Sequence, residues 1–148
     1  MNRHIAKFLR HLDSERNSSP HTIKAYREDL FSLAEYLADD TGATPNPASI
    51  TTIELRGYVA ALAEAGFAKT SIARRLASVR SFYRFGQREG WAKSNPAAAL
   101  RNPRKGRKLP HFLTNSEIAK LLAAPPKKGN PGTRDRAILE TLYSAGLR

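Results

Sequence analysis

A ten-residue stretch, RNPRKGRKLP at positions 101–110, constrains the fold more than any other part of the chain. It carries five basic and no acidic side chains, and Pro103, Gly106 and Pro110 interrupt it. Such a stretch cannot be helical throughout and repels itself, so it favours an extended linker over a solvated surface loop. We therefore expect a domain over residues 1–100, a basic linker over 101–112 and a second unit over 113–148.

On both sides of this linker the residue types favour helices. The chain holds 22 Ala and 16 Leu but only two Val, and Ala and Leu are good helix formers whereas β-branched residues suit strands. Capping boxes at Thr51–Glu54 and Thr114–Glu117 mark two helix starts, and a stretch rich in proline and glycine predicts a loop at 124–132. The sequence thus predicts an all-α fold, with a four-helix bundle and then two further helices. Their expected positions are 3–15, 20–38, 51–66, 69–89, 114–123 and 133–145.

Several classes of protein are not expected from the residue types. The chain has no cysteine, which excludes a disulfide framework, a cysteine-ligated metal and thiol catalysis. Its four histidines have no second ligand at a spacing that a shared turn would impose, so we expect no metal site and no cofactor. The longest stretch without charge, residues 41–53, is too short to span a bilayer. We expect a cytoplasmic protein with no membrane partner.

The formal net charge of +12 makes an anionic partner the first expectation, and duplex DNA is the partner we predict. Helix 69–89 has an apolar stripe at Ile72, Leu76, Val79 and Tyr83, and its other side combines hydroxyls with arginines. Such a surface lets a nucleic-acid backbone approach while the guanidinium groups reach phosphates or guanine edges. The alternative is a merely solvated face. The DNA contacts predicted on this helix are Lys69, Thr70, Ser71, Arg74, Arg75, Ser78, Ser81 and Arg88, with Arg84 flanking them.

Two further segments carry predicted DNA contacts. The first turn of helix 20–38 has free backbone N–H groups and the positive end of the helix dipole, which suit a phosphate. Here the predicted contacts are Ser19, His21, Thr22, Lys24 and Arg27. The basic linker adds Arg104, Lys105, Arg107 and Lys108. Together the segments predict a clamp with basic elements along one side.

Three runs of sequence resemble the tyrosine recombinase (phage integrase) family, and within it the bacterial Xer recombinases. SPHTIKAYREDL at 19–30 is similar to the entry motif of the family's core-binding domain, and KTSIARRLASVRSFYRFGQREG at 69–90 is similar to that domain's last long helix. TRDRAIL at 133–139 and YSAGLR at 143–148 resemble the run that ends on the family's first catalytic arginine. The resemblance implies a core-binding, SAM-like bundle followed by an incomplete catalytic domain, with Arg148 as that arginine.

The resemblance also implies a chemistry. Family members cut and rejoin DNA through a phosphotyrosyl intermediate without a metal or cofactor, to resolve chromosome dimers or to integrate DNA. A second recombinase subunit, in a tetrameric synaptic complex, is the implied partner of the full-length parent. The family's lysine, His-x-x-Arg pair and nucleophilic tyrosine all follow the first arginine. We therefore expect residues 1–148 to bind DNA without cleaving it, and none of the five tyrosines to be the nucleophile.

Two other functions remain open at the level of the sequence. One is a stand-alone helical DNA-binding regulator, which would dimerise. The other is a basic RNA-binding or ribosome-binding protein, which recognises structured RNA by charge and shape.

Overall fold

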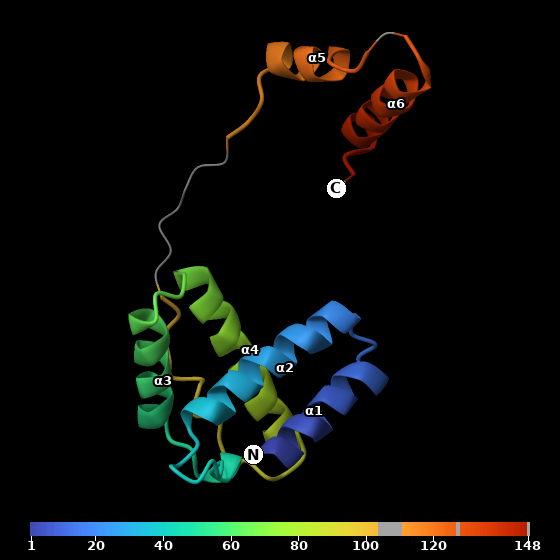
Figure 1. The fold of residues 1–148 in the computed structure, drawn as a ribbon. Coiled ribbons are helices and arrows are strands. Elements are labelled where there is room, and N and C mark those ends of the chain that lie inside the picture. The colour runs from blue at the N-terminus through green and yellow to red at the C-terminus, as the bar shows by residue number, and fades with distance from the viewer. Residues whose placement is uncertain (104–110, 127, 148) are drawn as a thin grey trace. The chain divides into compact units, whose positions relative to one another are not determined.

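The computed structural model describes residues 1–103, 111–126 and 128–147, and these form helices and loops without a strand. The chain divides into two compact units, Met1–Gly106 and Arg107–Arg148, and each is described by itself. The all-α fold predicted from the sequence is confirmed (Figure 1).

The first unit is a four-helix bundle whose helices start and end within about two residues of their predicted positions. Ser19 caps the second helix with proline at its first position, and the predicted capping box of Thr51 and Glu54 opens the third. Hydrogen bonds from Thr51 hold the pKa of Glu54 below its usual value. The bounds are α1 Asn2–Ser14, α2 Pro20–Tyr36, α3 Thr52–Glu64 and α4 Lys69–Arg88, with a short 3-10 helix, η1, at Pro47–Ser49.

The last helix of the bundle, α4, packs against each of the other three (Figure 1). Its buried side chains therefore cover more than one face. Phe82 packs against Phe8 of α1 and against Trp91, which follows α4. The Tyr83 hydroxyl donates to the Pro47 carbonyl at 2.9 Å, and burial raises the pKa of this phenol well above its ordinary value.

After α4 the chain returns along the bundle, and Arg80 fixes it there. The Arg80 guanidinium donates to the carbonyls of Ala97 at 3.0 Å and Leu100 at 2.6 Å, and to the Asn102 side chain at 2.9 Å. Arg80 therefore holds the segment that leads to the predicted linker, which explains why this arginine is only partly exposed.

Gly86 is required where α4 meets Trp91. A Cβ at this buried position would overlap the Trp91 ring. We expect Gly86→Ala to lower the free energy of unfolding by about 1–3 kcal/mol, although alanine favours a helix over glycine by about 1 kcal/mol. Denaturation followed by Trp91 fluorescence measures it. Gln87→Ala, at the next, exposed position, is the control. Stabilisation by Gly86→Ala would contradict the close packing.

The second unit contains α5, Asn115–Ala123, and α6, Asn130–Ala145. The predicted capping box is confirmed, since Thr114 and Glu117 bond reciprocally, and these bonds hold the pKa of Glu117 low. The predicted start of the last helix, at 133, is wrong, because α6 already begins at Asn130. Pro131 lies in its first turn, where the missing N–H leaves no bond unmade.

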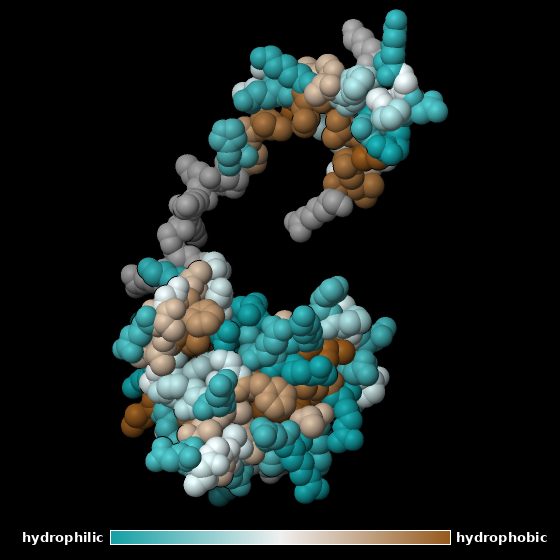
Figure 2. Space-filling view, in the orientation of Figure 1, coloured by the Kyte–Doolittle hydropathy of each residue, from teal (hydrophilic) through white to brown (hydrophobic). Residues whose placement is uncertain are grey.

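The two helices of the second unit leave a large apolar surface. Hydrophobic side chains gather on the sides of α5 and α6 that face each other (Figure 2). Leu121 and Tyr143 are 47% and 60% exposed, and Phe112, just before α5, is 78% exposed. Exposed apolar surface of this kind is typical of a face that packs against other protein.

Candidate nucleic-acid interface

The outward side of α4 forms a continuous stripe along the whole helix. Its members recur at alternating spacings of four and three residues, which keeps them on one side of a helix. Ser81 is partly buried and the others are exposed. We name this set, Thr70, Arg74, Ala77, Ser81, Arg84 and Arg88, the α4 stripe. It carries three arginines and no acid.

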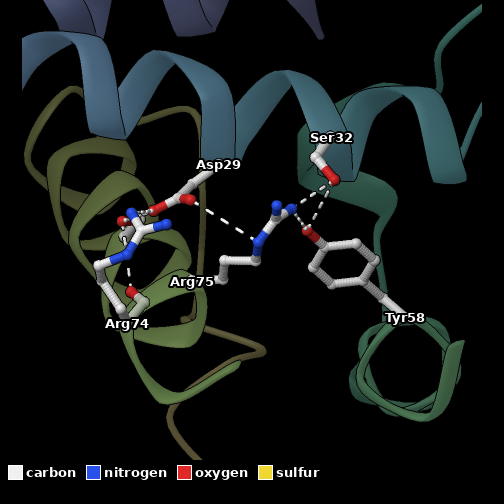
Figure 3. A network of polar contacts seen from close by, with 6 residues as sticks. Asp29, Ser32, Tyr58, Arg74 and Arg75 are labelled. Carbon is white, nitrogen blue, oxygen red and sulfur yellow. Dashed lines mark hydrogen bonds and ion pairs between the residues drawn. The ribbon is translucent and has the colours of Figure 1, made fainter. Parts of the chain in front are cut away.

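Arg74 is the member of the stripe that a buried carboxylate holds in place. Its Nη1 donates to Oδ2 of Asp29 on α2 at 2.6 Å (Figure 3). The Ser78 hydroxyl donates to the same oxygen at 2.7 Å. The Asp29 side chain is fully buried, whereas Arg74 is 50% exposed. Asp29 therefore anchors one end of the Arg74 guanidinium, and the exposed remainder can meet a ligand.

Arg75 belongs to the same network but lies inside it. Its Nη1 donates to the Ser32 hydroxyl at 2.6 Å and to the Tyr58 hydroxyl at 3.3 Å (Figure 3). Its Nε lies 3.9 Å from Oδ1 of Asp29, and its guanidinium covers the Phe67 ring with 4.6 Å to the centroid. The side chain is only 14% exposed. Arg75 thus joins α2, α3 and α4.

The predicted placement of Ser78 beside the outward side is therefore wrong, and Arg75, another predicted DNA contact, is held inside this network. A single apolar stripe does not reveal that α4 packs against three helices and buries a wider arc. The network also contains Asp29, which the sequence reasoning missed. The sequence does indicate that Asp29 is buried, because it lies three residues after Tyr26 and four before Leu33, on the apolar side of α2. An acid at such a position needs a buried partner.

The polar groups predicted at the start of α2 are exposed, but one of its backbone N–H groups already donates to a side chain within the helix start. Ser19 caps the helix by accepting the Thr22 N–H at 3.2 Å, and His21 and Thr22 are exposed. Lys24 and Arg27 line a different groove, between α1 and α2, with Ile23 and Phe31. The structure therefore does not bring these two residues to the α4 stripe.

At the first turn of α4, Lys69 and Thr70 are exposed and Ser71 is partly buried. This turn begins at Ala68, which provides no side-chain cap. No side chain therefore caps the first backbone N–H groups of α4, and uncapped N–H groups at a helix start suit an anion.

The other end of the α4 stripe opens into a cleft of about 300 Å³, which we name the basic cleft. Ser81, Arg84 and Arg88 line it from α4, and His11 and Arg16 line it from α1 and the residues that follow. Phe8, Tyr26 and Phe85 add aromatic rings. The sequence reasoning missed His11 and Arg16 because neither lies on a predicted basic helix face.

The remaining predicted contacts, Arg104, Lys105, Arg107, Lys108 and the candidate catalytic Arg148, lie outside the described residues. Among the described residues, no helix is long and apolar enough to cross a membrane. Those residues also contain no group of three or more side chains that could hold a metal ion.

Comparisons with known proteins match more than half of this chain to one family. The family described as "Phage integrase, N-terminal SAM-like domain" matches residues 5–90. Tyrosine recombinase XerC of Pelotomaculum thermopropionicum is 41% identical over 148 aligned residues, which cover 98% of this chain and 48% of that protein. XerC of Pelobacter propionicus is 42% identical over 144 residues, covering 97% and 47%.

A solved structure shares the fold. The crystal structure of XerA recombinase matches with a TM-score of 0.53 over 95% of this chain and 45% of that one, at 22% identity. The chain spans about half the length of the relatives it matches.

Proposed function

Because the chain belongs to the phage integrase family of tyrosine recombinases, we propose that its helical bundle binds duplex DNA as the N-terminal half of a site-specific recombinase. The observation that carries this proposal is the α4 stripe, with three arginines and no acid on the outward side of one helix. Arginines separated by short side chains allow the DNA backbone to approach and then bind its phosphates.

The anchored guanidinium of Arg74 supports the proposal further. Holding one N–H on Asp29 at 2.6 Å reduces the side-chain freedom that DNA binding would otherwise remove. Such an arginine suits either a phosphate or a guanine edge, since its fork of donors is planar. Lys69 and Thr70, at the first turn of the same helix, would extend the contact surface.

For the whole protein we propose the family's chemistry. The domains would be 1–100 for DNA binding, 101–112 as a linker and 113–148 as the beginning of the catalytic domain, with Arg148 stabilising charge on the reacting phosphate. The enzyme would act in the cytoplasm as a tetramer of recombinase subunits on DNA. Its task would be to resolve chromosome dimers before cell division or to integrate DNA.

Direct competition tests the proposal against the RNA-binding alternative. With the chain bound to a labelled duplex, we expect unlabelled duplex to displace the label and structured RNA of equal length to displace it far less. Fluorescence anisotropy measures both. Equal or better competition by RNA would contradict the proposal and indicate an RNA-binding protein.

A further inference from the structure

The basic cleft holds more positive charge than its surroundings neutralise. Arg16, Arg84 and Arg88 line it, and no lining residue is acidic. Among the residues that the structure describes, Arg16 and Arg84 form no ion pair. Guanidinium groups around one half-open space can direct several N–H donors at one anion.

The third arginine of the cleft has a carboxylate beside it. Oε2 of Glu15 lies 4.0 Å from Nη2 of Arg88 and 2.8 Å from Nδ1 of His11. The Arg88 Nη2 is also 3.0 Å from Nε2 of His11. The same Arg88 nitrogen lies 3.2 Å from Nδ1 of that ring, so Arg88 contacts both ring nitrogens of His11 while Nδ1 also meets Glu15. This chain of contacts places Arg88 beside Glu15.

We propose that the basic cleft binds one phosphate group of the DNA backbone, and that Glu15 is an internal competitor for Arg88. The proposal rests on the proposed function and deepens it, because the cleft continues the α4 stripe through Ser81, Arg84 and Arg88. An entering phosphate takes the place of the Glu15 carboxylate beside Arg88. Glu15 is 66% exposed, so it can turn to solvent without a large desolvation cost.

Removing the competitor should therefore tighten DNA binding. We expect Glu15→Gln to raise the affinity of the chain for duplex DNA by about two- to fivefold, the range expected for losing one exposed ion pair. Glu64→Gln is the matched control, because it removes the same charge at an exposed position at the end of α3. Anisotropy titrations at one fixed salt concentration compare the two. Equal gains in both variants would overturn the role of Glu15.

A double-mutant cycle separates competition from general charge. If Glu15 acts by occupying Arg88, the gain from Glu15→Gln disappears in an Arg88→Ala background. Arg84→Ala should weaken binding and reduce the steepness of the log–log salt dependence by about one unit, as one lost phosphate contact does. Arg3→Ala, an exposed arginine on α1 outside the cleft, should change this steepness far less. A gain that persists without Arg88, or equal effects of Arg84→Ala and Arg3→Ala, would overturn the site.

Failure of the site is distinguishable from failure of the proposed function. If the unaltered chain binds duplex DNA but these variants behave as their controls do, the site is wrong and the function stands. If the chain binds no DNA, a titration with inorganic phosphate tests the site by itself. We expect saturable shifts of the Tyr26 and His11 ring resonances by NMR, larger in Glu15→Gln. Unchanged resonances would overturn the site.

Discussion

Asp29→Ala should lower the free energy of unfolding of the bundle by about 3–5 kcal/mol, the range for removing one partner of a buried ion pair. The Asp29 carboxylate is fully buried and accepts bonds from Arg74 and Ser78. Without it, the nearly buried Arg75 guanidinium loses its nearest negative charge. Denaturation followed by fluorescence of Trp91, the single tryptophan, measures the loss in the bundle.

Two variants test the cause of this loss. Asp29→Asn keeps the shape and an oxygen that can accept from Ser78, so a smaller loss is expected. Asp40→Ala removes an exposed carboxylate after α2, and should change the free energy of unfolding by less than about 0.5 kcal/mol. A loss at Asp29 no larger than at Asp40 would show that the network contributes little to stability.

The helices were predictable because their signals are local. Thr51 with Glu54, and Thr114 with Glu117, each join two side chains three residues apart, so the sequence contains the whole interaction. The start of α6 was predicted three residues too late because its local signal is ambiguous. Proline and glycine at 131 and 132 indicate a loop, yet Pro131 fits a first helical turn. Gly132 packs where a Cβ would meet the Pro126 carbonyl.

The candidate nucleic-acid interface was only partly predictable, because the number of helices packed around α4 decides which of its side chains are exposed. Periodicity finds the stripe containing Arg74 and Arg88, but it cannot tell that Arg75 and Ser78 face a buried Asp29 on another helix. That distinction depends on contacts between residues more than 40 positions apart. The basic cleft likewise requires Arg16 to approach the end of α4, which no pattern within one helix indicates.

The affinity of the chain for duplex DNA should fall steeply with salt. If about five to eight phosphates are neutralised, log affinity changes with log salt at a slope of roughly −4 to −7. Between 50 and 200 mM salt, this corresponds to a loss of roughly 10²- to 10⁴-fold. The physical cause is the release of counterions from the DNA as arginines and lysines replace them. Anisotropy titrations at four or more salt concentrations give the slope.

Single charge removals then locate the contacts that produce the slope. Lys69→Ala, at the exposed first turn of α4, should make the slope shallower by about one unit. Arg136→Ala removes the same charge from the second unit, where Arg136 pairs with Glu140 at 3.1 Å, and should leave the slope nearly unchanged. A single-stranded oligonucleotide should give a shallower slope than the duplex, because its charge density is lower. A flat salt dependence for the unaltered chain would exclude phosphate binding as the source of affinity, since no other contact responds to salt so strongly.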